Sequence, residues 1–386
     1  MNHTPERHNF RLLGAVYVLH FIRHGMVFPL IPLFAQELGG GPTEIGLVAS
    51  SFNLLAMFLA TPIGGITEKA GIRAVLLSGA ACNIAYSILL AISSSLGVLI
   101  LAQIFGGLGF LFLIVSSQTY VSHLSEAHLR ERGFGFLALM ASLGFMLGPP
   151  LGGALSVGFG YRRVFALSGL LAATGIMVFF LKKESGSAGP SGEHETGMGS
   201  QLKGLFADSR LVSALVVSFM VVFVVNLRSS FLPVLLKEKA LDETTIGVLY
   251  GISAAAMAAV RLTIGRVMGR VSREGLLAVT LILLAAGYGL LPLFSAPGWL
   301  GAVLLLAGFG FGISQPLTMV MVSDHSRSGL AMGVRFTMIT SATVLSPLLM
   351  GWIVHVKGLH MPFYAGAIMI LGLGLLWVKR PFQARA

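Results

Sequence analysis

Two histidines and an arginine interrupt the apolar stretch VLHFIRHGMVFPLIP, residues 18–32. His20, Arg23 and His24 recur at spacings of three and four residues, which places them on one face of a helix. An arginine near a bilayer centre costs roughly 2.5–3.5 kcal/mol on insertion scales, so it requires a partner or a water-filled space. Histidine titrates near neutral pH, so this face has the chemistry to bind an anion and to carry a proton.

Three further arginines fall inside apolar segments: Arg228, Arg261 and Arg335. All fifteen acidic residues lie outside the centres of these segments. A cavity with arginines and no acid suits an organic anion, because guanidinium groups match carboxylate, phosphate and sulfonate geometry. The alternative is that Arg261 and Arg335 extend to the inner interface, while Arg23 binds backbone carbonyls.

Amide side chains inside apolar segments are further candidates for the substrate path. With Arg23, His24 and Arg228, we expect the following four to line it: Asn53, Gln103, Asn226 and Gln315. The alternative for each is a hydrogen bond between packed helices. His20 and His24 are the candidates for proton coupling, because the other histidines lie away from the segment centres.

The composition explains why charged residues are so informative here. The chain has 386 residues, of which 55% are hydrophobic and only 11% are charged. Apolar runs of about twenty residues recur, and each is long enough to cross a hydrocarbon core of roughly 30 Å. We therefore expect an all-α integral membrane protein, since backbone groups in lipid must be satisfied internally. The net charge of +11 is better explained by basic residues flanking membrane spans than by nucleic-acid binding.

Twelve spans are predicted, six on each side of one long polar segment. The spans are placed near 12–36, 44–67, 73–93, 96–121, 133–157, 161–182, 210–236, 244–268, 274–294, 297–322, 329–354 and 358–379. The polar segment, 183–209, is rich in Gly, Ser and charge and is expected to be a flexible cytoplasmic linker. The domains are thus an N-terminal bundle over 1–182 and a C-terminal bundle over 210–386.

The distribution of Lys and Arg predicts the topology. With a cytoplasmic N-terminus, 17 of the 26 basic residues fall on the inner side, 5 fall on the outer side and 4 lie within spans. This asymmetry favours a multi-pass protein of a bacterial inner membrane with both termini in the cytoplasm.

The two halves also resemble each other in sequence. At an offset of 201, Pro32 aligns with Pro233 and Gly46 with Gly247. Later in the halves the offset is 198, and Pro149 aligns with Pro347. Two pseudo-symmetric six-helix bundles with a site between the repeats are typical of a transporter.

The segment GGITEKAGIR, residues 64–73, resembles the loop motif of the major facilitator superfamily, which reads roughly Gly-x-x-x-Asp-Arg-x-Gly-Arg-Lys. The corresponding positions are Gly64, Glu68, Lys69, Gly71 and Arg73. The second half retains Gly265 and Arg270 in GRVMGRVSRE. We expect these residues to form the loop after span 2 and a cytoplasmic latch between helices.

The fifth span, GFGFLALMASLGFMLGPPLGG, resembles the span 5 motif of drug:proton antiporters in the same superfamily. It fits Gly-x8-Gly-x3-Gly-Pro-x2-Gly-Gly at Gly135, Gly144, Gly148, Pro149, Gly152 and Gly153. Small residues at these spacings let helices pack backbone to backbone, and Pro149 is expected to bend the helix.

Span 4 departs from the antiporter pattern, which reads Arg-x-x-Gln-Gly-x-Gly. In LAQIFGGLGF, Gly107 and Gly109 match, but Gln103 stands at the arginine and Gly106 at the glutamine. Proton coupling through that arginine is therefore not carried over to this chain, which leaves the histidines of span 1.

The resemblance implies that spans 1, 4, 7 and 10 line a central cavity and that spans 2, 5, 8 and 11 meet between the halves. Arg261 and Arg335 would then take part in gating. We expect a monomeric secondary transporter that works by rocker-switch alternating access and exports a small organic anion or amphiphilic compound in exchange for protons. The alternatives are a proton-coupled uptake symporter and, less favoured, a sensor or assembly factor.

An enzyme is not expected. The sequence lacks HExxH, a metal-spaced His/Cys cluster, a nucleophile elbow and a P-loop, and its one cysteine, Cys82, lies in a span without a paired base. We therefore expect no cofactor, no metal and no nucleic-acid partner, and we name the lipid bilayer, a small molecule and protons as partners.

Overall fold

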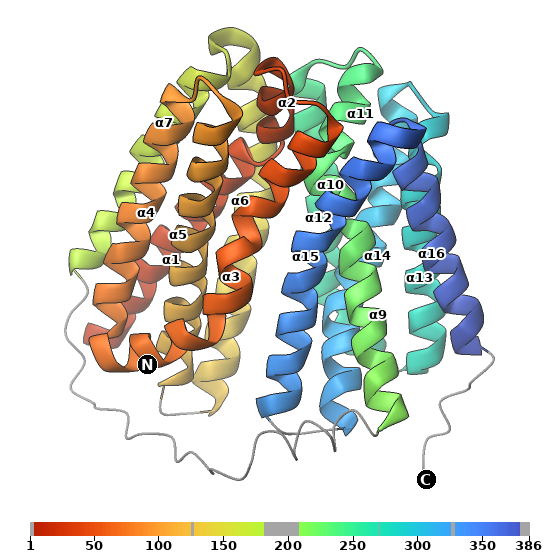
Figure 1. The fold of residues 1–386 in the computed structure, drawn as a ribbon. Helices are drawn as coiled ribbons and strands as arrows, with labels where there is room; N and C mark the ends of the chain where they lie inside the picture. The colour runs from red at the N-terminus through yellow and green to blue at the C-terminus, as the bar shows by residue number, and fades with distance from the viewer. Residues whose placement is uncertain (1–3, 125–126, 181–207, 269, 326–328, 379–386) are drawn as a thin grey trace. The chain divides into compact units, whose positions relative to one another are not determined.

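The computed structural model describes residues 4–124, 127–180, 208–268, 270–325 and 329–378, and every regular element in these ranges is a helix (Figure 1). The helices of the first half are α1 (Thr4–Val27), α2 (Leu30–Glu37), α3 (Pro42–Ala70), α4 (Ile72–Ile92), α5 (Leu96–Ser122), α6 (Ala127–Phe159), α7 (Tyr161–Ala173) and the 3₁₀ helix η1 (Thr174–Phe180). The expected linker, 183–209, lies almost wholly outside the described residues.

The second half continues the same architecture. Its helices are α9 (Ser209–Val225), α10 (Leu227–Ser230), α11 (Leu232–Glu238), α12 (Glu243–Met268), α13 (Arg273–Gly289), η2 (Leu291–Leu293), α14 (Pro297–His325), α15 (Gly329–Lys357) and α16 (Met361–Val378). The contacts divide the chain into two compact units. Unit 1 comprises Met1–Gly192 with Leu241–Gly251, and unit 2 comprises Glu193–Ala240 with Ile252–Ala386.

Twelve membrane-crossing segments account for these helices. Among the described residues, ten segments are long and apolar enough to span a bilayer, and Met361–Leu375 is a shorter apolar helix. The remaining predicted span, 161–182, falls on α7 and η1, where the α-helix gives way to a 3₁₀ helix after Ala173. The predicted all-α membrane fold with twelve helices is confirmed.

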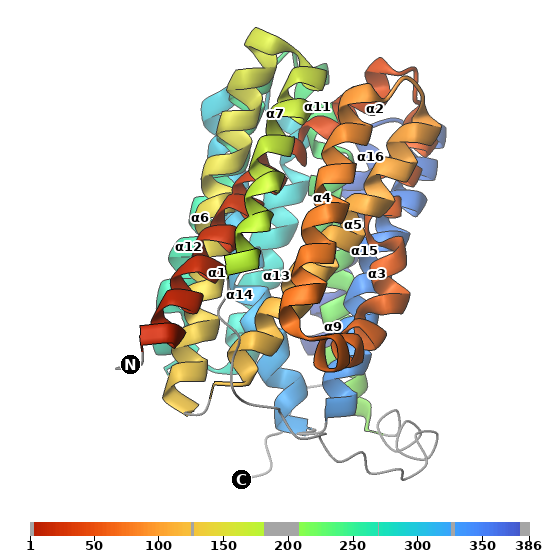
Figure 2. The same ribbon diagram turned by 90° about the vertical axis from the view of Figure 1, so that its left-hand side faces the viewer.

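The two units pair their helices in the same way. In unit 1, α1 packs on α6 and α7, while α4 packs on α5 and α7, as the two views show (Figures 1 and 2). In unit 2, α9 packs on α15 and α16, and α13 packs on α14 and α16. The same pairs of spans therefore pack together in both repeats. Numbered within each half, these are the first with the fifth, the third with the fourth, and the third with the sixth.

Tight turns repeat as well. Gly39 and Gly160 have positive φ angles of 83° and 76°, and in the second half Ala240 and Gly358 have φ angles of 60° and 87°. These pairs are separated by 201 and 198 residues, the offsets of the sequence repeat. Ala240 therefore occupies a left-handed conformation that glycine adopts with less strain.

Two predicted spans are broken rather than continuous. The first stops at Val27 and resumes as α2 at Leu30, beside Pro29. The seventh stops at Val225, continues as the single turn α10, and resumes as α11 with Pro233 in its first turn. Proline removes a backbone donor and restricts the residue before it, which accounts for the breaks at Pro29 and directly before Pro233; the break at Asn226 lies seven residues before Pro233, and proline does not explain it.

The expected loop over 64–73 is wrong in its extent. Helix α3 continues through most of this motif to Ala70, and only Gly71, with φ 87°, separates it from α4. Gly71 lies between the two helices in a backbone conformation that would be strained for other residues, which explains why glycine occupies this turn. The motif is therefore the last turns of a helix followed by a one-residue reversal.

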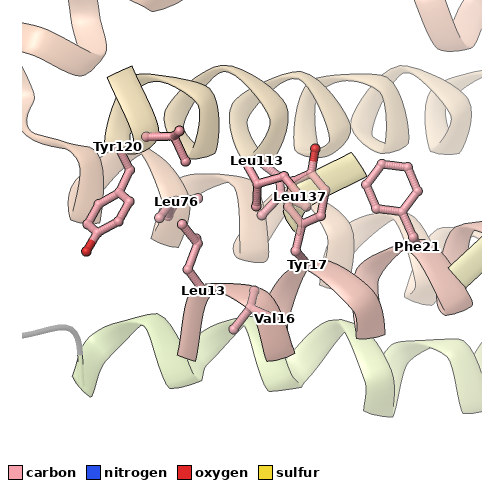
Figure 3. Close-up of a cluster of buried hydrophobic side chains, with 9 residues drawn as sticks. Leu13, Val16, Tyr17, Phe21, Leu76, Leu113, Tyr120 and Leu137 are labelled. Atoms are coloured by element: carbon pink, nitrogen blue, oxygen red, sulfur yellow. The ribbon is translucent and has the colours of Figure 1, made fainter. Parts of the chain in front are cut away.

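A buried apolar cluster fixes the inner part of unit 1 (Figure 3). It joins α1, α4, α5 and α6 through Leu13, Val16, Tyr17, Phe21, Leu76, Leu113, Tyr120, Val121 and Leu137. On α1, the last residue of the cluster is Phe21, which lies between His20 and Arg23, so the polar residues adjoin the cluster on the same helix. Apolar packing thus sets the position of the polar face that begins at His20.

Candidate functional site

The polar face of α1 is buried inside unit 1. Arg23 is 0% exposed, and His20 and His24 are 7% and 6% exposed. The imidazole rings of His20 and His24 lie nearly parallel, with centroids 6.5 Å apart. The structure therefore brings together the three residues that the sequence placed on one helix face.

Helix α4 supplies the partners of Arg23. The Nη2 group donates a hydrogen bond of 2.7 Å to Oδ1 of Asn83, and the guanidinium carbon lies 5.3 Å from the centre of the Tyr86 ring. Asn83 in turn donates a 2.9 Å hydrogen bond to the carbonyl oxygen of Gly79. Within the described residues, Nε and Nη1 of Arg23 are buried without a hydrogen-bond acceptor. A full positive charge is thus held by one amide and one aromatic ring.

Glycines of α6 hold α1 in this position. A Cβ atom on Gly148 would lie 2.5 Å from the carbonyl oxygen of Ile22, and Cβ atoms on Gly144 and Gly152 would also collide with the α1 backbone. These three glycines are spaced by four residues, so they form one face of α6. On α5, Gly109 leaves the space that Asn83 fills.

A second face of α6 packs against the start of α12 within unit 1. A Cβ atom on Gly153 would collide with the carbonyl oxygen of Glu243, and one on Gly247 with that of Pro149. The Tyr161 hydroxyl donates a 2.6 Å hydrogen bond to Oε1 of Glu243. At Gly135, by contrast, a Cβ atom would have nothing within 4 Å. Five of the six motif positions therefore lie at close contacts or beside them.

His24 has aromatic neighbours on four sides. Its ring centroid lies 5.5 Å from Phe28, 5.2 Å from Phe52, 5.1 Å from Phe110 and 5.7 Å from Phe145. These rings come from the end of α1 and from α3, α5 and α6. All four are partly exposed, so His24 lies beneath an aromatic surface rather than among charged groups.

The other two polar candidates of unit 1 differ in burial. Gln103 on α5 is 5% exposed, and its Oε1 is buried without a donor among the described residues. Asn53 on α3 is half-buried. The structure places neither in a hydrogen bond with Arg23.

In unit 2, the break after α9 positions Asn226 and Arg228. The carbonyl oxygens freed there accept hydrogen bonds from side chains: Ser346 donates to Phe223 at 2.5 Å, and Tyr288 donates to Val225 at 3.3 Å. Asn226 donates to the carbonyl of the preceding turn. The broken backbone is therefore satisfied by α13 and α15, as the hydrocarbon region requires.

Arg228 follows the break and is half-buried. Its Nη1 lies 3.4 Å from the sulfur of Met257 on α12. Thioether sulfur is a weak acceptor, so this contact compensates little of the guanidinium charge by itself.

Arg335 on α15 is also half-buried and binds α14. Its Nη2 donates to Oγ1 of Thr318 at 2.9 Å and approaches the side-chain and backbone oxygens of Gln315 at 3.4 Å. The structure thus joins two of the predicted residues. Arg261 on α12 is exposed.

The residues of the proposed cytoplasmic latch lie at helix ends. Lys69, Arg73 and Arg270 are exposed, and Gly64 has nothing within 4 Å of a Cβ position. The side chain of Glu68 lies outside the described part of the chain. Their latch role remains a prediction.

Four contributors to these sites were not among the predicted residues. Asn83 and Tyr86 hold Arg23, Met257 contacts Arg228, and Thr318 binds Arg335. Asn83 carries a usable signal, because it is an amide near the middle of an apolar span. The others are ordinary residues of apolar helices, so only the packing identifies them.

Comparison with known proteins agrees with this architecture. The profile of the Major Facilitator Superfamily matches residues 13–328. The chain is 26% identical to the quinolone resistance protein NorA of Staphylococcus aureus over 164 residues, which is 42% of this chain and 41% of NorA. It is 22% identical to multidrug resistance protein 2 of Bacillus subtilis over 392 residues, which covers 97% of this chain and 96% of that protein.

Solved transporter structures share the fold. The nucleoside transporter NupG superposes with a TM-score of 0.80 at 15% identity and covers 100% of both chains. The human organic anion transporter MFSD10 superposes with a TM-score of 0.66 at 19% identity, over 97% of this chain and 100% of that one. The chain therefore belongs to the Major Facilitator Superfamily, and these relatives and structural neighbours are named for transport or drug resistance.

Proposed function

We propose that this transporter exports a small organic anion or an amphiphilic compound in exchange for protons, by alternating access. One observation supports the charge of the substrate. In the described part of the chain, the hydrogen-bond partners of Arg23 and Arg335 are all neutral: an amide, a hydroxyl and a carbonyl. Each guanidinium therefore keeps its positive charge inside an apolar span, where an anion would compensate it.

In this proposal some arginines contact the substrate directly, and one acts on it without contact. In unit 2, the partly exposed Arg228 and Arg335 are the groups that contact the substrate, together with Asn226 and Gln315. Arg335, expected above to act in gating, is included because it binds Gln315. In unit 1, the half-buried Asn53 is the contact candidate. Arg23 is enclosed, so it acts through its field.

His24 and Gln103 complete the proposed substrate path in unit 1. The partly exposed phenylalanines around His24 offer surface for the apolar part of an amphiphilic molecule. Such a site would combine apolar contact with a few polar groups, as small-molecule sites generally do.

Export is favoured by two observations. The α6 glycines match the antiporter motif and make close contacts, and relatives named for drug resistance align with the chain. MFSD10 illustrates that this fold serves organic anions in at least one protein. Protons are the proposed coupling ion, with His20 and His24 as carriers, in a bacterial inner membrane with both termini cytoplasmic.

Everted membrane vesicles provide the test. When the vesicle interior is made acidic, the vesicles are expected to accumulate the anion carboxyfluorescein but not the cation ethidium. An uncoupler is expected to abolish this accumulation. Uptake of ethidium alone would contradict the anion proposal. Accumulation only under the opposite gradient would indicate symport and contradict export.

A charge-removing variant sharpens this test. Arg335→Gln is expected to raise the apparent KM for carboxyfluorescein about 10- to 100-fold, as expected for losing a charged hydrogen bond worth about 1.5–3 kcal/mol. The matched control is Arg163→Gln, because Arg163 is exposed on α7 outside the proposed path. Equal KM values for the two variants would remove Arg335 from the substrate site.

A further inference from the structure

A small cavity lies inside unit 1, on the side of α1 that faces α4 and α7. Its volume is about 20 Å³, measured over positions open to the centre of a water molecule. Val16 and His20 of α1, Asn83 of α4, and Leu171 and Thr174 near the end of α7 are among its lining residues. A site of roughly 10–15 Å³ on this measure is enough for one water, so the cavity has room for one.

The cavity also has the polar groups that a water needs. Nε2 of His20 is buried and has no hydrogen-bond partner among the described residues. Asn83 uses one amide hydrogen on Gly79, which leaves its second amide hydrogen for another acceptor. The Thr174 hydroxyl donates to the Leu171 carbonyl at 2.6 Å, so its oxygen lone pairs stay available as acceptors. Two to four polar partners are typical of a buried water.

The two histidines of α1 therefore have different surroundings. His24 is ringed by four phenylalanines, whereas His20 lines the cavity together with Asn83 and Thr174. A proton can be exchanged only where water or another carrier reaches the nitrogen. The geometry thus distinguishes His24, beneath the aromatic surface, from His20, beside a cavity large enough for one water.

Charged neighbours of His20 come from its own helix. Arg23 and His24 are the groups that act on it electrostatically, and Tyr17 lies one turn earlier. The residues that other elements place beside His20 or with it around the cavity are uncharged: Asn83 from α4, Phe110 and Leu113 from α5, Leu171 and Ala172 from α7, and Thr174 from η1.

We propose that His20 is the proton carrier and that it exchanges its proton through a water in this cavity, on a route separate from the substrate path. This inference rests on the proposed proton coupling. In the tautomer protonated at Nδ1, the lone pair of Nε2 accepts a proton from a hydronium ion, which leaves imidazolium and neutral water; release is the reverse reaction. The cavity reaches Thr174 and Gly175, where α7 gives way to η1, and we place the entry of water there.

Hydration can be measured without transport. Radiolytic hydroxyl labelling of the purified full-length protein is expected to modify Val16, Leu113 or Leu171, and Val16→Leu, which extends a side chain into the cavity, is expected to suppress it. The control is Val279→Leu, the same change at a side chain that is 48% exposed on α13. Wild-type protein without labelling at these residues would overturn the proposal.

Proteoliposomes loaded with carboxyfluorescein provide the second measurement. Val16→Leu is expected to slow proton-driven transport about 100-fold, the usual scale for losing a positioned proton-transfer group, while substrate counterflow is retained. Thr174→Val removes the hydroxyl at nearly constant shape and is expected to act in the same direction if Val16→Leu does not fold. Unchanged proton-driven transport in a folded variant overturns the route alone, whereas uncoupler-insensitive transport by wild type overturns proton coupling itself.

Discussion

Helices α1 and α9 open the two halves, yet they are held against their fifth-helix partners in different ways. Gly144, Gly148 and Gly152 of α6 bring its backbone against that of α1. Adding 198 to these numbers gives Ala342, Ser346 and Met350 on α15, so side chains occupy the corresponding positions in unit 2. Ser346 uses its hydroxyl to bind the carbonyl oxygen of Phe223.

The exposure of the arginines differs between the halves in the same way as the helix packing. Helix α1 is continuous around Arg23 and encloses it, whereas α9 ends at Val225 and leaves Arg228 half-buried beyond the break. Backbone-to-backbone contact excludes water and small molecules, while a broken helix capped by side chains leaves polar groups accessible. One repeat thus encloses its arginine, and the other leaves its arginine partly exposed.

The largest expected effect comes from removing the partner of the enclosed charge. Asn83→Leu leaves the Arg23 guanidinium without its hydrogen-bond acceptor, which costs about 3–5 kcal/mol for a buried charge. We expect a large fall in the thermal unfolding temperature of purified protein. Asn53→Leu, at a half-buried amide of the same unit, serves as the control and is expected to change it little. Equal unfolding temperatures for the two variants would show that the buried Arg23 does not depend on Asn83 as its hydrogen-bond acceptor.

Matched alanine substitutions test the packing contrast directly. Gly148→Ala places a methyl group against the α1 backbone and is expected to cost about 1–3 kcal/mol. Ser346→Ala loses one hydrogen bond and is expected to cost about 1 kcal/mol. Gly135→Ala, in open space on the same helix as Gly148, is expected to be neutral. Denaturation curves for the three variants would contradict the contrast if Gly148→Ala were the mildest.

Each unit also has a buried tyrosine on its third span, and removing the hydroxyl distinguishes their roles. Tyr288→Phe loses the bond to the Val225 carbonyl at the break and is expected to cost about 1 kcal/mol. Tyr86→Phe keeps the ring that faces Arg23 and is expected to have almost no effect. The same thermal unfolding assay separates the two, and a larger loss for Tyr86→Phe would reverse the assignment.

The smallest effects are expected at the repeated turns. Gly39→Ala forces an alanine into a left-handed conformation and is expected to cost about 1 kcal/mol, whereas Ala240→Gly relieves the same strain and is expected to stabilise by a few tenths of that. Opposite shifts in unfolding temperature would support the equivalence of the two turns. Shifts of the same sign would argue against it.

Much of the fold follows from the sequence, because long apolar runs and small-residue spacing are local signals. The membrane spans, the resemblance between the two halves and the close packing of Gly148 were predictable on these grounds. Pro29 marks a place where a helix can bend, but proline is also tolerated within continuous helices such as α6, which passes through Pro149, so its presence does not predict a break. The break at Asn226 has no proline within six residues and therefore no such signal. The extension of α3 to Ala70 was hidden by turn-forming glycines that remain helical.

The site was predictable only in part. Spacing on α1 indicated that His20, Arg23 and His24 share a face, but periodicity within one helix does not reveal which residue of another helix meets it. The partnership of Arg23 with Asn83 spans 60 residues and depends on how α1 and α4 pack. Likewise, the cavity beside His20 is set by side-chain sizes on several helices at once.

The hydrogen bond between Arg23 and Asn83 has a consequence for biogenesis. The ribosome adds Arg23 60 residues before it adds Asn83, so the arginine enters the translocon with no acceptor yet made. At roughly 2.5–3.5 kcal/mol, its transfer into lipid alone is unfavourable. We therefore expect the first span to enter the bilayer less favourably alone than together with the third, whose Asn83 supplies the acceptor.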